Sequence, residues 1–429
     1  MWGNKPNLLM IQYEGKSYLM KVYLVGGAVR DKLLGISAHE KDWVVVGATP
    51  EHLLRQKFRQ VGKDFPVFLH PETNEEYALA RTERKSGSGY YGFECDFSTS
   101  VTLEEDLARR DLTINAIAMD EHDNLIDPYH GQRDIQDKIL RHVSPAFAED
   151  PVRVLRVARF AARFYSLGFR LAEETRALMY SMVTRGELAH LVPERVWQEM
   201  QRSLTEKNPE QFILTLRACD ALRVVLPELN ALFGVPNPVK YHHEIDSGVH
   251  TLMVLQAAVA LSPNPVTRFA ALVHDLGKAA TPIRDWPKHH GHEERGVAIV
   301  EHLCTRLRIP NDYRTLAVMV SRHHLNIHRL FELRASTVVA LLDRTDAFRR
   351  PHLFYELLLA CQADAEGCGR KVDYMQTQLW STILSECAKV NPQQLIAQGY
   401  EGKAIKEALH QRRVACVELI LKAWKANEK

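Results

Sequence analysis

The pattern of apolar and polar residues changes near residue 150. Before it, short apolar runs rich in β-branched and aromatic residues alternate with helical patterns and Gly, Pro or Asn turns, at 22–25, 43–46, 77–81 and 125–126. This alternation predicts a mixed α/β domain. After it, almost every segment has the period of an amphipathic helix, interrupted by turn clusters at 236–240 and 262–265. We therefore predict an α/β domain followed by a helical region.

Composition places few limits on function. The 429 residues suffice for about two to four domains. A net charge of +2 hardly indicates a polyanionic partner, so a nucleic-acid surface must arise from local clustering. The seven cysteines include no CxxC pair, which favours reduced thiols in a cytosol. No apolar run approaches the ~20 residues that span a bilayer. We expect a cytoplasmic protein without membrane contact, and we assign no function to the N-terminal extension, residues 1–19, which lacks signal-peptide features.

The first candidate site begins at Gly26-Gly27, between a predicted strand and a helical pattern that starts near Ala28. Glycine lets backbone amides approach a phosphate, and a helix N-terminus adds partial positive charge. Arg30, in the first turn, is placed to meet the same triphosphate. A Gly-Gly pair after a strand is also compatible with a simple turn.

Two acids follow this turn, Glu40 and Asp42, at the start of an apolar run. Residues i and i+2 of a strand share a face, so both carboxylates can converge on one ion. Paired carboxylates completed by substrate phosphates are a common way to hold catalytic Mg²⁺. An acid-x-acid pair at a strand end is otherwise usually a solvated edge.

Together, the Gly-Gly and acid-x-acid features resemble the signature of DNA polymerase β-like nucleotidyltransferases. Further stretches are similar to the bacterial class II tRNA CCA-adding enzymes of the tRNA nucleotidyltransferase/poly(A) polymerase family: GGAVRDKLLG, KDFPVFLH, EYALARTERKSG, RRDLTINAIAMD, DPYHGQRDI and EDPVRVLRVARFAARF. This likeness extends from about residue 20 to about residue 420. One residue departs from the family pattern: the first metal carboxylate is usually aspartate, whereas here it is Glu40, with the same ligand chemistry on a longer stem.

The resemblance implies an α/β nucleotidyltransferase head with a DNA polymerase β-like mixed sheet, followed by an all-α neck, an HD body and a tail. We expect the head at 20–150, the neck at 151–240, the HD phosphohydrolase domain at 241–350 and the tail at 351–429. In the head, Mg²⁺ on Glu40 and Asp42 would activate the 3′-hydroxyl of tRNA and stabilise the leaving pyrophosphate. The oligomeric state, monomer or homodimer, stays open.

The second candidate site is an arginine-rich helical stretch. Residues 151–172 contain five arginines and no acid. On a helix of 3.6 residues per turn, four of them lie within about 120° of one another: Arg153, Arg156, Arg159 and Arg163. The absence of a compensating acid within the stretch favours an anion-binding stripe over a solvated basic face.

Asp150 before Pro151 is compatible with a simple helix cap. The family resemblance implies a sharper role, in which Asp150 and Arg153 recognise the incoming base. Cytosine and adenine both present an amino donor beside a ring-nitrogen acceptor, which a carboxylate and a guanidinium complement. Guanine and uracil invert this pair. The resemblance also implies that Arg110, Arg156 and Arg159 contact ribose and phosphates, with Gly27 and Arg30 on the triphosphate of ATP or CTP.

Two glycine-containing segments are candidate substrate contacts. Residues 84–92 (RKSGSGYYG) combine two cations, three glycines and two tyrosines, which is compatible either with a mobile loop near the site or with a plain hairpin. Residues 399–409 resemble the family's tail pattern, and Gly402 before a helix could meet a phosphate, although a simple cap explains it equally well.

The third candidate site is a histidine set in the helical half. His250 opens an apolar helix and His274-Asp275 ends another, followed by His289, His290, His292, His323 and His324. An apolar helix rarely ends in a His-Asp pair that must be desolvated without a partner. Imidazoles with carboxylates suit a transition metal, and we favour Ni²⁺ over Mn²⁺ or Zn²⁺. The run resembles an HD phosphohydrolase domain, which implies His250, His274, Asp275 and Asp364 as ligands and His274 and Asp275 as catalytic residues. A degenerate, structural version is the alternative.

The resulting hypothesis is template-independent addition of C, C and A to tRNA from CTP and ATP. By resemblance, the HD domain would add phosphohydrolysis of 2′,3′-cyclic phosphates and 2′-nucleotides. Three alternatives remain: a poly(A) polymerase of the same class, a protein whose main activity is HD phosphohydrolysis, and a non-catalytic tRNA-binding protein. Poly(A) polymerases lack an HD domain. The intact acid pair and the arginine stripe argue against phosphohydrolysis as the main activity, and the presence of both metal sets argues against a non-catalytic protein.

Overall fold

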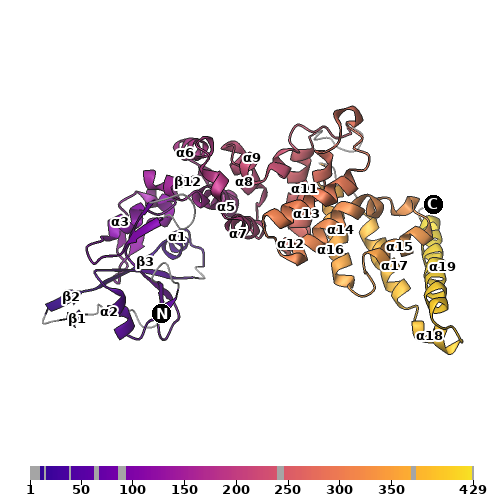
Figure 1. Ribbon diagram of the computed structural model, residues 1–429, viewed down its shortest axis with the longest axis horizontal. Helices are drawn as coiled ribbons and strands as arrows, with labels where there is room; N and C mark the ends of the chain where they lie inside the picture. Colours follow the sequence, from indigo (N-terminus) through magenta and orange to yellow (C-terminus); the bar gives the residue numbers. More distant parts are fainter. Residues whose placement is uncertain are drawn as a thin grey trace. The chain divides into compact units, whose positions relative to one another are not determined.

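The computed structural model of the chain describes residues 10–13, 16–37, 40–61, 67–85, 93–238, 246–368 and 373–427. Within them the chain divides into two compact units. The first comprises residues 1–203 and 211–225, and the second comprises residues 204–210 and 226–429. The first contains a mixed sheet and a group of helices, and the second is helical (Figure 1). The predicted fold class is confirmed, whereas the domain limits expected from the sequence stay a prediction.

The sheet of the first unit has seven strands among the described residues, in the order β11-β10-β3-β4-β7-β6-β5. β4 is antiparallel to β3 and parallel to β7, so the sheet is mixed as expected. Short β-branched and aromatic runs form it because such side chains pack well on a pleated, half-buried surface. The strands are β3 (Lys21–Val25), β4 (Asp42–Val46), β5 (Arg59–Val61), β6 (Val67–Leu69), β7 (Glu76–Leu79), β10 (Ala118–Met119) and β11 (Leu125–Ile126).

Apolar clusters lie on this sheet. Val44 and Val45 are successive residues of β4, and they belong to different clusters because successive side chains of a strand point to opposite faces. Val45 packs with Phe68 and Leu79, and Val44 packs with Leu107 of a head helix. The head helices are α1 (Gly27–Leu33), α2 (Pro50–Arg55), α3 (Leu103–Ala108) and α4 (Gly131–Asp137). Two separate hairpins are β1 (Met10–Tyr13) with β2 (Lys16–Leu19), and β8 (Thr82–Lys85) with β9 (Phe93–Asp96).

The rest of the first unit is helical. A short parallel pair, β12 (Ile139–Leu140) with β13 (Arg170–Leu171), flanks the long helix that carries the arginine stripe. Nearly every position of this helix, α5, is buried or half-buried, so it lies in the interior rather than on a solvated face. The helices are α5 (Val152–Phe164), α6 (Glu173–Thr184), α7 (Pro193–Leu204), α8 (Glu210–Ala218) and α9 (Leu222–Val225).

The second unit opens with a helical bundle. α11 packs against α12 and α16, and α14 packs against α12, α13 and α16. The predicted positions of two histidines on their helices are confirmed, because His250 lies in the first turn of α11 and His274 caps the C-terminus of α12. The helices are α10 (Pro227–Asn230), α11 (Ser247–Leu261), α12 (Pro265–Val273), α13 (His292–Arg306), α14 (Asn311–His328) and α16 (Pro351–Glu366).

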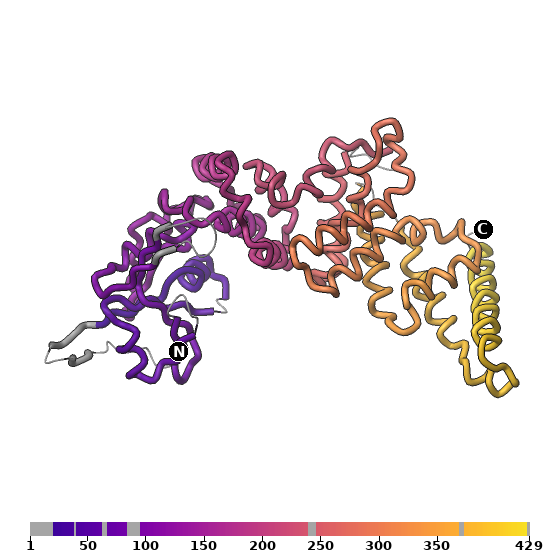
Figure 2. Tube along the Cα trace, in the orientation of Figure 1, coloured from indigo at the N-terminus to yellow at the C-terminus, as the bar shows by residue number. Residues whose placement is uncertain are grey.

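The C-terminal helices of the second unit pack around the last one. Figure 2 shows this final helix, α19 (Lys403–Asn427), as the yellow end of the chain. It packs against α15 (Ala335–Arg344), α17 (Gln376–Ala388) and α18 (Pro392–Ala397). All seven cysteines are free thiols, as expected from their spacing. Among the described residues, no helix has the length and apolar character needed to cross a membrane.

Candidate functional site

The two head carboxylates lie where the sheet meets the Gly-Gly turn. The antiparallel register places Asp42 opposite Val25, the residue before Gly26, so the acid lies beside the turn. On its other side Asp42 pairs with Glu76 of the parallel strand β7. Strand β4 begins at Asp42, and Glu40 precedes it, so the two acids lie at the strand mouth rather than both within a strand.

The electrostatic surroundings of Asp42 suit a cation. Its side chain is accessible to solvent, yet the many protein atoms around it limit hydration, and this partial burial raises the pKa of Asp42. The charge of Glu40 raises this pKa further, whereas Arg110 and Arg156 oppose the rise. Two carboxylates near enough to affect one another are the oxygen-rich set that Mg²⁺ takes, so these residues fit the predicted ion.

The glycine turn lets an arginine approach this site. Gly26 has φ +69°, and a Cβ there would lie 2.8 Å from Nη1 of Arg110. A side chain at residue 26 would therefore be strained by its backbone and would displace that guanidinium. Arg110 also donates to Asp106, at 3.1 Å. Gly27 begins helix α1 directly after the turn.

Arg30, which was predicted to contact the triphosphate, is buried and contacts other side chains of the protein. It is 3% exposed, donates to Asp31 and Asn115, and lies over the rings of Phe160 and Phe164. A phosphate contact would require Arg30 to exchange some of these partners, so this role stays a prediction.

The arginine stripe is ion-paired, which corrects one premise of its interpretation. The acids that are absent from residues 151–172 come from distant parts of the chain and meet each arginine. The nitrogen–oxygen distances are 3.8 Å for Arg153–Glu83, 2.7 Å for Arg156–Asp111, 2.5 Å for Arg159–Glu199 and 3.0 Å for Arg163–Asp31. A solvated basic face is thereby excluded. Anion binding here would have to compete with built-in carboxylates.

Asp111, the acid that pairs with Arg156, is strongly stabilised in its charged form. Burial opposes ionisation of Asp111, but the Arg156 guanidinium and hydrogen bonds from Asn115 and the Leu112 amide outweigh it, and its pKa falls well below the usual range. Because Arg156 also affects Asp42, this arginine links the stripe to the carboxylate pair.

The predicted base-reading residues, Asp150 and Arg153, lie next to each other at the start of α5. Helix α5 begins at Val152 with Pro151 as its N-cap, one residue later than expected, yet Asp150 still accepts from the Val152 amide at 3.0 Å. Asp150 also accepts from Nη2 of Arg195 at 3.0 Å. Arg153 is 6% exposed and donates from Nη1 to the Ala146 carbonyl at 2.6 Å. Sequence reasoning missed Arg195, because it lies in another helix, α7, 45 residues from Asp150.

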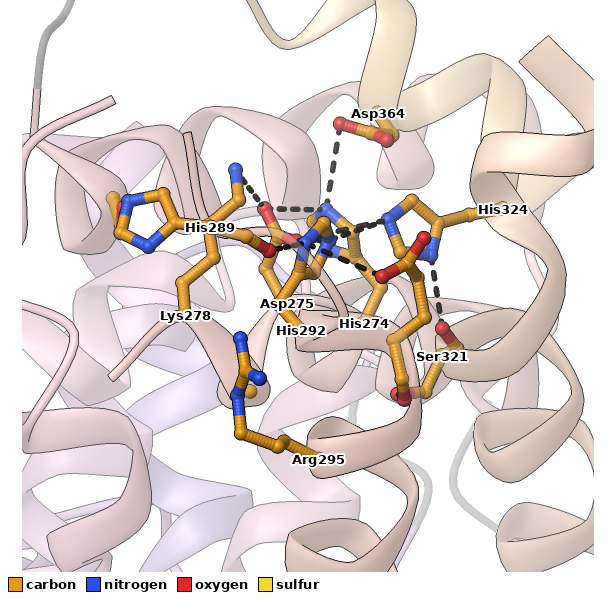
Figure 3. A network of polar contacts seen from close by, with 12 residues as sticks. His274, Asp275, Lys278, His289, His292, Arg295, Ser321, His324 and Asp364 are labelled. Atoms are coloured by element: carbon orange, nitrogen blue, oxygen red, sulfur yellow. Dashed lines mark hydrogen bonds and ion pairs between the residues drawn. The ribbon is translucent and has the colours of Figure 1, made fainter. Parts of the chain in front are cut away.

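In the second unit, three helices bring the four predicted HD ligands together, and Figure 3 shows His274, Asp275 and Asp364 among them. His250 comes from α11, His274 and Asp275 from the end of α12, and Asp364 from α16. His250 Nε2 lies 2.9 Å from Asp364 Oδ1, and His274 Nε2 lies 3.1 Å from Asp275 Oδ2 and 3.4 Å from Asp364 Oδ1. All four predicted ligands therefore lie in one cluster.

This cluster is deeply buried and strongly coupled. Burial favours the neutral ring of His274, but Asp275 and Asp364 together raise its pKa to about 10. The pKa of Asp275 is held well below its usual range, because His274 and Lys278 outweigh the effect of burial. These buried carboxylates strongly stabilise the protonated, positively charged form of the neighbouring ring, and they would stabilise another cation at this place in the same way. His250, His274 and Asp275 also have ligand atoms near enough to hold one metal ion.

Close packing between elements creates this geometry. Gly277 follows Asp275 in a 3₁₀ turn (Leu276–Lys278) that packs against α13, and a Cβ on it would lie 1.9 Å from the His292 carbonyl oxygen. Only glycine permits this approach without moving α13. The turn and the helix are therefore held near enough for Asp275 to face His292.

Three further histidines join the cluster. His292 and His324 were noticed in the sequence without a ligand role, and together with Asp275 they form a second group that could hold an ion. His328 was missed: its Nε2 lies 2.8 Å from Asp364 Oδ2, and its Nδ1 lies 2.8 Å from the Tyr374 hydroxyl. Its signal was its spacing, since His324 and His328 are four residues apart on one face of α14.

The other histidines of the set have different surroundings. Nε2 of His289 lies 2.7 Å from the Pro236 carbonyl oxygen. His290 is exposed, and His323 is the buried neighbour of His324 outside both groups that could hold an ion.

The two glycine-containing segments predicted to contact substrate differ in how far the structure describes them. The loop expected at 84–92 lies outside the described residues from 86 onward, and the side chains of 84 and 85 are likewise outside them. Gly402 has φ +53° and directly precedes α19, which agrees with a helix cap. Phosphate binding there stays a prediction.

Comparisons with known proteins agree with this arrangement. Residues 22–141 match a poly A polymerase head domain, residues 168–233 match a probable RNA and SrmB-binding site of polymerase A, and residues 248–350 match an HD domain. A multifunctional CCA protein of Legionella pneumophila (strain Paris) is 75% identical over 410 residues, which cover 96% of this chain and all of that protein. The chain belongs to the multifunctional CCA protein family. A multifunctional CCA protein of Teredinibacter turnerae is 56% identical over 411 residues, which cover 95% of this chain and all of that protein.

Solved structures show the same fold. A CCA-adding enzyme from Bacillus stearothermophilus in complex with CTP is 24% identical, with a TM-score of 0.62, over 95% of this chain and 94% of that one. The Thermotoga maritima CCA-adding enzyme complexed with tRNA_CCA is 22% identical, with a TM-score of 0.59, over 96% of this chain and 92% of that one. This chain and these CCA-adding enzymes therefore share one architecture.

Proposed function

We propose that this protein adds C, C and A to the 3′ end of tRNA without a nucleic-acid template, using CTP and ATP. The observation that carries the proposal is the position of Asp42, beside the Gly26-Gly27 turn, with Glu40, Arg110 and Arg156 around it. Relatives named multifunctional CCA proteins, and structures of similar fold bound to CTP, ATP or tRNA, support it. A tRNA substrate would place the protein in the cytoplasm.

In the head, one group of residues would contact the metal ion and the phosphates, and another group would contact the base. Glu40 and Asp42 would hold Mg²⁺, which neutralises phosphate charge and favours attack by the tRNA 3′-hydroxyl. Arg110 and Arg156 lie near Asp42 and supply positive charge for the ribose and phosphates of the nucleotide. Gly27 offers its backbone amide at the start of α1. Arg30 and Arg159 can join only by exchanging the acids that they contact now.

The base would be selected by Asp150 and Arg153. The carboxylate of Asp150 is held by Arg195 and by the start of α5, so its free electron pairs are aimed by two independent contacts. An amino group of cytosine or adenine can donate to that carboxylate while Arg153 donates to the ring nitrogen. Guanine and uracil present the opposite pattern, so a ring N–H donor would face the Arg153 donor and a carbonyl acceptor would face the Asp150 carboxylate. These mismatched polar groups would strongly disfavour either base.

A poly(A) polymerase of the same class would share this head. The HD cluster and the multifunctional CCA relatives favour CCA addition. The two functions differ in product, since a poly(A) polymerase needs only ATP and adds many residues.

The test uses tRNA that lacks its 3′ trinucleotide, with each NTP singly and in combination, followed by sequencing of the product ends. We expect two C residues from CTP alone and a single terminal A after both nucleotides. The Asp42→Ala variant should lose addition while staying folded, and Glu40→Asp should keep measurable activity because the ligand type survives. Untemplated A-tracts from ATP alone, or parental rates in Asp42→Ala, would contradict the proposal.

We further propose that the HD cluster hydrolyses 2′,3′-cyclic phosphates and 2′-nucleotides, consistent with repair of damaged tRNA ends. The supporting observation is the convergence of His250, His274, Asp275 and Asp364 in one buried cluster. Mixed nitrogen and oxygen donors suit Ni²⁺, Mn²⁺ or Zn²⁺, of which we favour Ni²⁺. Such an ion would polarise a phosphoryl oxygen.

A further inference from the structure

The sheet fixes only one of the two head acids directly. Asp42 is the last residue of β4 in the described register on both sides, opposite Val25 of β3 and Glu76 of β7. Glu40 lies two residues before the start of β4, outside that register. Residues i and i+2 share a face only while the backbone stays extended as in a strand. A contact outside the strand ladder must therefore fix the segment that carries Glu40 if both carboxylates are to meet one ion.

Glu75, the residue before β7, makes such a contact. Its Oε1 lies 3.0 Å from Nζ of Lys41, and its Oε2 accepts a hydrogen bond from Nε1 of Trp43 at 2.9 Å. Lys41 and Trp43 are the two residues that flank Asp42 along the chain. Because successive side chains of a strand point to opposite faces, Asp42 points away from Glu75. One carboxylate therefore holds the chain on both sides of Asp42 from the opposite face of the sheet.

Glu75 is itself fixed relative to β4. Its backbone amide donates to Oγ1 of Thr73 at 3.3 Å, and its carbonyl oxygen accepts from the His70 amide at 3.0 Å. The Trp43 ring stacks on that of Tyr77, with 5.6 Å between the ring centroids and 15° between the planes. Since each carboxylate oxygen binds a different donor, the Glu75 side chain cannot rotate without losing a contact.

We propose that Glu75 is a positioning residue of the head metal site: it fixes residues 40–42 so that both carboxylates of this segment converge on one Mg²⁺. The inference rests on the nucleotidyl transfer proposed above, which gives the ion its role. Groups that orient metal ligands without binding the metal typically contribute about 10- to 100-fold in metal affinity or activity. Glu75 acts through the neighbours of Asp42 rather than on a ligand itself, so we expect the lower end, about tenfold.

Charge alone predicts a different result, which makes the inference testable. If Glu75 and Lys41 acted only through their charges, Glu75→Gln would weaken cation binding slightly and Lys41→Met would strengthen it. If their ion pair positions the two acids, both substitutions weaken cation binding. The double variant should then bind a cation no more weakly than either single variant, because both substitutions remove the same contact.

The experiment measures cation binding to the full chain in two ways. Addition of CMP to tRNA that lacks its 3′ trinucleotide is followed as the Mg²⁺ concentration is raised. Without nucleotide, binding of Tb³⁺, a hard cation that takes oxygen ligands, is followed by its luminescence on excitation of tryptophan. The part of this signal that Asp42→Ala abolishes reports the head site. We expect Glu75→Gln and Lys41→Met each to raise both half-saturation concentrations about tenfold, with most of the rate restored at saturating Mg²⁺.

Glu72→Gln is the matched control. Glu72 lies in the same turn, is exposed, and contacts His70 through its backbone amide rather than through its carboxylate. This substitution removes the same charge and should leave both half-saturation concentrations unchanged. A merely structural role of Glu75 would lower the melting temperature or the active fraction without changing either concentration. The Lys41 side chain is 36% exposed, so Lys41→Met tests the same contact even if Glu75→Gln does not fold.

The outcomes separate this inference from the proposed function. Unchanged half-saturation concentrations in a folded Glu75→Gln protein, or tighter Tb³⁺ binding in Lys41→Met, would overturn the positioning role and leave CCA addition intact. A parent protein that adds no nucleotide to the tRNA would overturn the proposed function itself.

Discussion

Asp42 illustrates how a single residue can be unfavourable for stability and required for chemistry. Its folded pKa is raised by partial burial and by Glu40. A carboxyl group with a raised folded pKa weakens the fold as pH rises from its unfolded pKa through its folded pKa, and has no effect when both states are protonated. Asp42→Asn should therefore melt at a higher temperature than the parent at pH 7, by roughly 1 °C because solvent screens this accessible side chain. The difference should shrink toward pH 4.

Thermal melts in the presence of a chelator check this, because bound Mg²⁺ would stabilise only the parent. Glu76→Gln at the start of the neighbouring strand is a control for loss of an acid at the same sheet edge. A parent that is more stable than Asp42→Asn at pH 7 would contradict the proposed strain at this carboxylate.

Arg153 tests base selection at the scale of one side chain. Arg153→Ala should damage discrimination as well as rate, because it removes the donor that rejects guanine and uracil. Discrimination built on buried polar groups is of order 10⁴ and should fall steeply. Competition between CTP and UTP, followed by sequencing, measures it.

Arg163→Ala is the matched control for this change, since Arg163 belongs to the same stripe and pairs with Asp31 at 3.0 Å. It should alter stability or rate without altering selectivity. An Arg153→Ala enzyme that is slower yet equally selective would make Arg153 a phosphate or structural residue.

At the scale of elements, helix α5 is joined to the helix α7 by a buried ion pair. Arg159 and Glu199 have side chains 8% and 7% exposed, with 2.5 Å between Nε and Oε2. Removing one partner of a buried pair leaves an uncompensated charge, which costs about 3 kcal/mol or more. Glu199→Ala should lower the free energy of unfolding of the first unit by that amount, as measured by urea denaturation.

An exposed pair in the same unit provides the comparison. Glu173 and Arg176 form an ion pair in which the Glu173 side chain is 75% exposed. Glu173→Ala should change the free energy of unfolding by about 0.5 kcal/mol at most, because surface pairs contribute little. Equal effects of both substitutions would mean that Arg159 is solvated and available to a nucleotide without exchange of partners.

At the scale of the whole molecule, the two proposed chemistries belong to different units. Glu40 and Asp42 lie in the first unit, whereas Asp275 and Asp364 lie in the second. Asp275→Ala should abolish phosphodiesterase activity on 2′,3′-cyclic AMP while C, C and A addition continues near the parental rate. Asp42→Ala should do the reverse. Both activities would be measured on both variants, with Mg²⁺ and Ni²⁺ varied independently.

Loss of nucleotide addition in a folded Asp275→Ala protein would show that the cluster supports tRNA binding rather than a separate reaction. The bifunctional proposal would then have to be abandoned. If both variants kept both activities, neither Asp42 nor Asp275 would have its proposed role.

The sequence alone was sufficient for features that depend on near neighbours. The strands β3 and β4, the Gly26-Gly27 turn and the position of His274 at a helix end follow from local periodicity and turn chemistry, and the structure confirms them. The change from an α/β domain to a helical region also follows from periodicity, whereas the family, the assignment of head, neck, HD body and tail, and the predicted HD ligands came from resemblance across the chain, which no single spacing could supply.

Only the tertiary structure decided which distant groups meet. The arginines of α5 have no acid within their own stretch, and the fold supplies one to each. Arg195 reaches Asp150, and His328 reaches Asp364. The tautomers of His292 and His324 are set by carbonyls three residues before each, but their convergence on Asp275 required the packing of three separate segments. Periodicity predicts which face of an element is buried, because it depends on near neighbours in the sequence. The residues that pack against that face come from distant segments, and only the path of the whole chain decides which they are.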